Sequence, residues 1–271
     1  MSSLLAVRPI GMARPAAPHP IHRRIEVHDH VVHRIRRLLQ RAGYAEVSIP
    51  PDGALPHSAG RLRLEEAIAD GSDAVYGEGG ATDKWMETVK RDMTLSELCT
   101  FQERLLKEVA VSLSADQIGG GNVTRLDRML RCEHPRMTYR DAMAILSRRG
   151  FDLEFGADLD AEAEGALIYH CGNLPIHITH SPVPIAPHGA KIDRSDSQVV
   201  EGVDYVLPFS GRTFGGWLRE TDADLLRRRP TSPTGASMEG CGVLSTENAI
   251  ERAGVSLSMG RLLYYLVGLD Q

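Results

Sequence analysis

The spacing of the apolar residues changes along this chain, and this change constrains the fold more than any other feature. Between Ile21 and Ala42 they recur every three or four residues, which predicts an amphipathic helix. Similar spacing, with capping residues Thr94 and Thr138 at two of the starts, predicts further helices over 62–69, 94–112, 138–149, 220–229 and 259–268.

Short alternating segments predict the strands. They cover 44–51, 73–76, 167–170, 175–179, 198–207 and 211–217, and glycine, proline and aspartate separate most of them. Helices followed by antiparallel strands and a last helix are typical of an α+β fold. We therefore expect an antiparallel β-sheet flanked by helices, with Leu225 and Leu226 turned toward the core.

The composition fits a globular protein with a buried core. The 271 residues are 42% hydrophobic and 25% charged, which excludes a wholly disordered chain, a collagen-like repeat and a disulfide-rich miniprotein. A formal net charge of −5 argues against a dedicated nucleic-acid binder. We expect a flexible N-terminal arm over 1–20 and a single domain over 21–271.

The cysteines and the apolar runs indicate a cytoplasmic protein. Cys99, Cys132, Cys171 and Cys241 are far apart and form no CxxC pair, as expected for free thiols in a reducing compartment. No apolar run reaches the ~20 residues of a membrane helix, and residues 1–20 lack the apolar core of a signal peptide. We predict no membrane partner.

The sequence lacks the motifs of common phosphate-binding, hydrolase and zinc-protease sites. It contains no GxxxxGK[ST], no GxGxxG before a helix, no GxSxG and no HExxH. The glycines at 77–80 are interpreted as a turn rather than a phosphate loop. Because His177 and His180 are three apart on an expected strand, they point to opposite faces. The histidine cluster is therefore interpreted as structural or hydrogen-bonding, with no metal site: His170, His177, His180 and His188.

A series of local patterns follows one another in a fixed order. They are RIRRLLQRAGYAEVSIPP at 34–51, GRLRLE at 60–65, a segment from 137 to 167, PIHITHSP at 175–182, VLPFSGRTFGGWLRE at 206–220 and GVSLSMGRL at 254–262. This order resembles the catalytic domain of class II aminoacyl-tRNA synthetases over about 21–271. The similar branch is the aspartyl/asparaginyl group, with the short archaeal asparagine synthetase-like enzymes derived from it.

The resemblance implies the same α+β fold, a homodimer and the use of ATP with Mg²⁺. In the family, the first helix and strand, at 25–51 in this chain, form the dimer interface. The separate barrel that reads the anticodon is not expected, because little more than the arm precedes the first pattern. Together with the net charge of −5, this argues against tRNA charging.

The amino-acid pocket of the family has counterparts in this chain. Arg219 matches the arginine that grips the substrate's side-chain carboxylate or amide, and a guanidinium suits that role because it binds a carboxylate bidentately. Glu162 matches an acid that lines the pocket, and Arg61 replaces a polar residue of the substrate loop. Gly215 and Gly216 leave room for a ligand near the backbone. Each charged residue has the alternative interpretation of a structural or solvated charge.

The nucleotide site departs from the family pattern. Arg212 stands where the family has the glutamate that holds Mg²⁺, and a cation there repels Mg²⁺ and attracts phosphate or carboxylate. The arginine that grips the α-phosphate has no counterpart near 79–85, although Trp85 takes the place of the aromatic that stacks on adenine. Arg261 matches the arginine that contacts the terminal phosphates. We therefore predict weak or absent magnesium-dependent ATP binding, with Arg212 and Arg261 as candidate catalytic residues.

Two functions follow from these patterns. The first is a repurposed synthetase-like enzyme that acts on aspartate, asparagine or a related small amino acid, with amide-bond formation in specialised metabolism as one option. The second is a catalytically dead paralogue that binds an amino acid or regulates another protein. A cleft in which several arginines converge needs an anionic ligand, and this favours the enzyme. The arginines expected to converge are Arg61, Arg212, Arg219 and Arg261.

Overall fold

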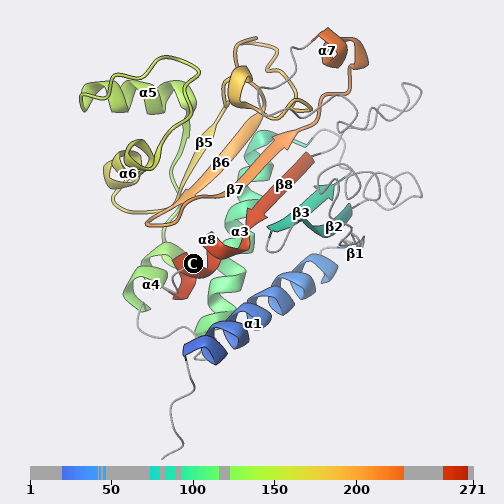
Figure 1. Cartoon of the computed structure of the whole chain (residues 1–271), viewed down its shortest axis with the longest axis vertical. Helices are drawn as coiled ribbons and strands as arrows, with labels where there is room; N and C mark the ends of the chain where they lie inside the picture. The colour runs from blue at the N-terminus through green and yellow to red at the C-terminus, as the bar shows by residue number, and fades with distance from the viewer. Residues whose placement is uncertain are drawn as a thin grey trace, which may run out of the picture.

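The computed structural model describes residues 20–41, 43, 45–46, 74–79, 83–88, 93–115, 123–228 and 253–267 (Figure 1). Several expectations of the sequence analysis lie outside these residues. They concern the arm before residue 20, the helix over 62–69, Arg61 and Cys241.

The described strands form one eight-stranded sheet, and this confirms the α+β fold. Its spatial order is β1 (Ala45–Glu46), β2 (Ala74–Gly79), β3 (Asp83–Thr88), β8 (Ala253–Ser258), β7 (Gly211–Leu218), β6 (Gly202–Leu207), β5 (Ile176–Thr179) and β4 (Arg136–Thr138). The central pairs are antiparallel, while the outermost pairs, β1–β2 and β4–β5, are parallel. The first three strands occupy one side of the sheet and β4 to β7 the other, and the last described strand, β8, lies between β3 and β7.

Helices cover both faces of the sheet (Figure 1). They are α1 (Pro20–Arg41), α3 (Leu95–Ala115), α4 (Val123–Arg131), α5 (Tyr139–Arg148), α6 (Ala161–His170), α7 (Ala223–Arg228) and α8 (Met259–Val267), with a 3₁₀ turn at Val183–Ile185. The main core lies between the sheet and α1, α3, α4 and α8. A second core packs α5 and α6 against β5 and β6. None of the described helices is long and apolar enough to cross a membrane.

The apolar stripe of α1 is covered by the same chain. Val27, Val31, Ile35 and Leu39 recur every four residues and are almost fully buried in the main core. Helix α3 is the element that α1 contacts most. Val31 and Ile35 are therefore used within the chain, and the dimer interface that the resemblance implies over 25–51 stays a prediction.

Capping boxes begin two helices, as the sequence predicted. The Thr94 Oγ1 accepts a hydrogen bond from the Glu97 backbone N–H at 3.2 Å, and the Glu97 carboxylate accepts one from the Thr94 N–H at 2.9 Å. Thr138 and Asp141 make the same reciprocal pair at the start of α5. Because these contacts are local in sequence, they identify both helix starts without any tertiary information.

Some expectations are corrected by the structure. The segment 167–170 is the last turn of α6 rather than a strand, because Asp160 caps that helix and Leu167 continues its buried face. Gly77 and Gly79 lie within β2, paired with β3, rather than in a turn. Leu225 is 41% exposed, whereas its neighbour Leu226 is buried as predicted. Helix α4 and strands β3, β4 and β8 were not predicted.

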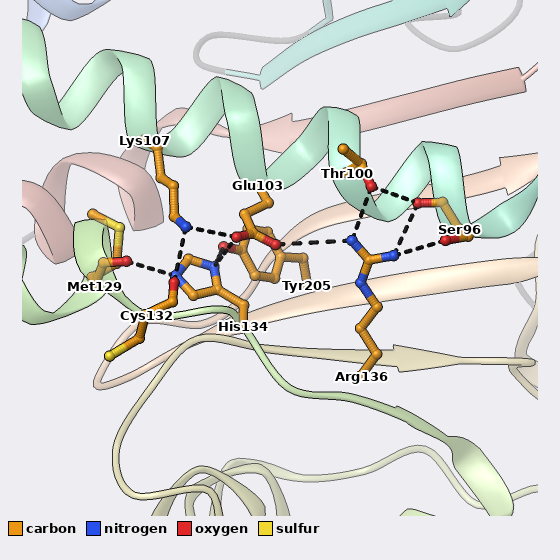
Figure 2. A network of polar contacts seen from close by, with 9 residues as sticks. All are labelled: Ser96, Thr100, Glu103, Lys107, Met129, Cys132, His134, Arg136 and Tyr205. Carbon is orange, nitrogen blue, oxygen red and sulfur yellow. Dashed lines mark hydrogen bonds and ion pairs between the residues drawn. The ribbon is translucent and has the colours of Figure 1, made fainter.

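A partly buried polar network joins α3 to β6 on the core side of the sheet (Figure 2). We call it the α3–β6 network and define it by Glu103, Lys107, His134, Arg136 and Tyr205. Lys107 Nζ donates to Glu103 at 2.7 Å and to the Cys132 carbonyl at 2.9 Å. Arg136 donates to the Ser96 carbonyl at 3.1 Å and approaches Glu103 at 3.9 Å.

Histidines occupy the centre of this network in their neutral form. His134 bonds the Tyr205 hydroxyl through Nδ1 and the Met129 carbonyl through Nε2, so the Nε2–H tautomer satisfies both contacts. Burial lowers the pKa of His134. His177 stacks on the Tyr205 ring with centroids 3.9 Å apart, and burial lowers its pKa to about 3. These histidines therefore have structural roles, as predicted for His177.

Candidate functional site

The candidate site lies on the sheet face opposite α3, where four neighbouring strands meet in register. Asp204 of β6 pairs with Gly215 of β7, Gly215 pairs with Ser256 of β8, and Ser256 pairs with Trp85 of β3. A cavity of about 260 Å³ opens over this row. Its lining includes Ser181, Ile185, Val200, Asp204, Arg212, Gly215, Trp217, Ser256 and Ser258. We call it the central cavity.

The two glycines of β7 have different roles. A Cβ on Gly215 would lie 2.9 Å from Ser256 Oγ and 3.8 Å from Asp204 Oδ1, so the bare backbone forms the floor of the central cavity. A Cβ on Gly216 would instead lie 2.9 Å from Gln102 Nε2 and 3.1 Å from Leu98 Cδ2, both on α3. Gly215 therefore leaves the backbone open at the floor of the central cavity, whereas Gly216 lets α3 pack closely.

Arg212 is surrounded by three carboxylates of the same chain. Its Nη2 lies 2.6 Å from Asp158 Oδ1 and 3.6 Å from Glu164 Oε1. Its Nε lies 3.4 Å from Asp204 Oδ2. We call this group of Arg212, Asp158, Glu164 and Asp204 the Arg212 cage. It joins β6, β7, α6 and the segment that precedes α6.

The charges of the cage are not balanced, because three carboxylates share one guanidinium. Burial raises the pKa of Asp204 to about 6, with Arg212 opposing this rise and Asp158 adding to it. Burial also raises the pKa of Glu164, and the charge of Arg212 again opposes the rise. The carboxylates in turn raise the pKa of Arg212 above its ordinary value. The cleft therefore favours an added positive charge.

A second cavity lies on the other side of Arg212. It measures about 650 Å³, and its lining includes Asp158, Glu164, Asn173, Phe209, Arg212 and Arg261. Arg261, in the first turn of α8, donates from Nη1 to the Arg212 carbonyl at 2.7 Å. Gly211 has φ +72°, and a Cβ there would lie 2.9 Å from Glu164 Oε2. Arg212 borders both cavities and thus forms part of the wall between them.

The structure brings some of the predicted site residues together. Arg212 and Gly215 line the central cavity, and Arg212 and Arg261 line the second cavity. The register pairs Trp85 of β3 with Ser256 of β8, two strands away from Gly215. Glu162 is exposed on α6, and Glu164, two residues further on, is the acid that enters the cleft. The sequence analysis missed Asp158, Glu164 and Asp204. An acid within the apolar strand 202–207 was the signal that could have identified Asp204.

Arg219 lies beyond the lining of the two cavities. It follows β7, is 8% exposed, and pairs through its backbone with Ala190. Its guanidinium carbon is 5.7 Å from the ring centre of Trp217. Trp217 is the residue that borders the central cavity, with Ala186, Ala190 and Val200 packed behind its ring. Arg219 and the cavity are thus connected through the Trp217 indole.

The described side chains do not fit magnesium-bound ATP. The carboxylates that could hold a divalent cation are paired with Arg212, and no three His, Cys, Asp or Glu side chains of the described ranges form a metal site. Around the two arginines of the cleft stand three acids, a poor environment for a triphosphate. The weak or absent magnesium-dependent ATP binding expected from the sequence stays a prediction.

The chain is similar to asparaginyl-tRNA synthetases over part of its length. No family model matches it. It is 34% identical over 124 residues to the asparaginyl-tRNA synthetase of Homo sapiens, a match that covers 44% of this chain and 26% of that protein. It is 28% identical over 193 residues to the asparagine–tRNA ligase of Pseudoalteromonas atlantica, covering 65% of this chain and 41% of that protein.

Solved structures share the fold over nearly the whole chain. The asparaginyl-tRNA synthetase of Pyrococcus horikoshii superposes with a TM-score of 0.78 and 22% identity, covering 94% of this chain and 66% of that one. Its complex with asparaginyl-adenylate gives a TM-score of 0.77 at 22% identity, with coverage of 93% and 67%. The chain therefore spans about a quarter to two fifths of the curated relatives named above and about two thirds of these solved chains.

Proposed function

We propose that this chain, which is similar in sequence to asparaginyl-tRNA synthetases and shares the fold of their solved structures, binds a small amino acid in the central cavity. The ligand is aspartate, asparagine or a related compound. The chain acts on this ligand as a repurposed synthetase-like enzyme and does not charge tRNA.

The observation that carries this proposal is the charge and size of the central cavity. Its volume of about 260 Å³ suits a ligand smaller than a nucleotide. Asp204 borders it, and its raised pKa means that an ammonium group next to it restores the ionised carboxylate. Ser256 and Ser258 offer hydroxyl groups for the remaining polar atoms.

Calorimetry with aspartate and asparagine, each alone and each with ATP and Mg²⁺, tests the proposal. We expect one of the two amino acids to bind without ATP, and Asp204→Asn to weaken that binding at least about tenfold. Asp152→Asn, which removes an exposed acid outside the two cavities, is the matched control and should bind normally. Failure of every small amino acid tried to bind the folded protein would refute the proposal.

A second candidate function is an amino-acid-binding or regulatory protein without catalysis. The Arg212 cage favours it, because a guanidinium held by three carboxylates has little capacity left for a phosphate ligand. Mass spectrometry of incubations with the bound amino acid, ammonia and ATP separates the two functions. An amide product supports the enzyme, whereas tight binding without any product supports the binding protein.

A further inference from the structure

The Arg212 cage is built from parts of the chain that are distant in sequence. Asp158 precedes α6, Glu164 lies in its first turn, and Asp204 and Arg212 lie on adjacent strands. Glu164 is only 7% exposed, so its carboxylate meets Arg212 with little competition from water. The cage is therefore a defined tertiary site with a cation at its centre.

Two further contacts hold the arginine backbone in this place. Arg261 donates to the Arg212 carbonyl at 2.7 Å from α8. At Gly211 a side chain would collide with Glu164, because a Cβ there would lie 2.9 Å from its Oε2. The hydrogen bond from Arg261 thus holds the backbone of Arg212. The absence of a side chain at Gly211 lets this backbone lie close to the Glu164 carboxylate.

The three carboxylates lie 2.6, 3.6 and 3.4 Å from nitrogens of the guanidinium, so its removal would leave them around one vacated position. With Arg212 present the described acids are not arranged as a metal site, but carboxylates without a shared cation repel one another and either take up protons or close on a divalent cation. Arginine avoids both outcomes, because it stays charged at every physiological pH and makes several directed hydrogen bonds. The guanidinium thus takes the position that a divalent ion would occupy, and it cannot dissociate because it is part of the chain.

We propose that the Arg212 guanidinium is the resident cation of the cage formed by Asp158, Glu164 and Asp204. It holds these carboxylates in place of a divalent metal and makes the cleft independent of one. Arg212 is therefore a positioning residue. This inference goes beyond the proposed function, since it concerns the cation of the cleft rather than its ligand.

Manganese binding to the full-length protein tests the proposal, with the free-ion signal followed by electron paramagnetic resonance. The wild-type chain should bind no Mn²⁺ in the cleft. Arg212→Ser should bind one Mn²⁺ at least about tenfold more tightly than wild type, because the freed carboxylates are suitable ligands. Adding Asp204→Asn to this variant should remove the gain.

The matched control is Arg261→Ser, which removes an arginine that donates to a backbone carbonyl and acts on one of the three carboxylates, Glu164, only through its charge. It loses the same formal charge and should bind no more Mn²⁺ than wild type. A gain equal to that of Arg212→Ser would mean that net charge alone attracts the ion, and the proposal would be wrong. A folded Arg212→Ser protein with no gain would also overturn it.

The wild-type protein provides an independent measurement if Arg212→Ser does not fold. Its melting temperature should be the same in EDTA and in millimolar Mg²⁺ or Mn²⁺, because the cage is already occupied. A metal-dependent rise that Asp204→Asn abolishes would place an ion in the cage beside Arg212 and refute the proposal. None of these readouts requires an amino acid to bind, so their failure is distinct from failure of the proposed function.

Discussion

Glu162 and Glu164 show how strongly the surroundings of a single residue decide its role. Both lie in the first turn of α6, and side chains two positions apart on a helix point in nearly opposite directions. Glu162 faces solvent, while Glu164 is buried against Arg212. Of these two glutamates, only Glu164 contributes charge to the Arg212 cage.

Glu164→Gln should weaken binding of aspartate or asparagine by about tenfold, because it removes one of the charges that attract the ligand's ammonium group. Glu162→Gln, on the same helix, should leave the affinity unchanged. Calorimetry on both variants measures the difference. Equal losses from the two variants would show that the acids act only through the overall field.

The resemblance makes Arg219 the anchor for the carboxylate or amide of the ligand's side chain, whereas the structure places its guanidinium against Trp217 and outside the lining of the two cavities. If the resemblance holds at this position, Arg219→Ala lowers the affinity by a factor of ten or more and Arg219→Lys does not restore it, because a point charge cannot reproduce bidentate geometry. Affinity is measured by calorimetry well below the melting temperature. If Arg219→Ala lowers the melting temperature and leaves the affinity intact, Arg219 has only a structural role beside Trp217.

At the scale of elements, α3 is fastened to the sheet by polar as well as apolar contacts. Its apolar side packs on the strands, and its neighbouring side carries Glu103 and Lys107 of the α3–β6 network. Buried neutral histidines are part of this junction. Acid therefore acts on the junction between α3 and β6.

Acidification below about pH 6.5 should destabilise the protein through His177. The unfolded chain takes up a proton near pH 6.5, whereas the folded pKa is about 3, so this stabilisation is complete above pH 6.5 and is lost progressively toward pH 3. Asp204, with a raised pKa of about 6, acts in the opposite direction as the pH falls from 6 toward its ordinary value.

His177→Phe isolates the histidine contribution because it keeps a ring stacked on Tyr205. Between pH 6.5 and 5.5 the variant should lose about 1 kcal/mol less unfolding free energy than wild type. Urea titrations at the two pH values measure this. His134→Phe is the contrasting variant, and it should be less stable already at pH 7 because it loses both hydrogen bonds. Identical pH slopes for wild type and His177→Phe would contradict the prediction.

At the scale of the whole molecule, the expected homodimer depends on the surface of α1 and on the β1 edge of the sheet. The buried stripe of α1 already belongs to the core of its own chain. Val32 and Leu38 remain partly buried beside that core, and β1 is the terminal strand of the described sheet. The proposed homodimer therefore depends on this remaining surface rather than on Val31 and Ile35.

Light scattering should give a mass near twice 29.7 kDa at micromolar concentration. Leu38→Lys should shift the mass toward the monomer, because a charge at the interface loses its hydration without a partner. Val111→Lys, at a site that is 54% exposed on α3, is the matched control and should leave the mass unchanged. A monomeric wild-type protein would show that the expected interface is missing.

Local patterns along the chain identify the helices α1, α3, α5 and α8 and the strands β5, β6 and β7, but not β3 or β8. Helical period, capping boxes and alternation act over a few residues, so they can be identified without knowledge of distant contacts. The same local character explains the error at 167–170, where a short apolar run of α6 has no feature that separates a helix end from a strand.

The strand order and the role of the charges in the cleft depend on contacts between distant residues, and they are visible only in the folded structure. Arg212 was expected to attract an external anion, but the sheet places Asp204 beside it and α6 brings Glu164 onto it, so the chain supplies its own anions. The third partner, Asp158, lies 54 residues before Arg212 in sequence. Pairing of charges depends on distance in space and on burial, and neither quantity is written in the spacing of residues along the chain.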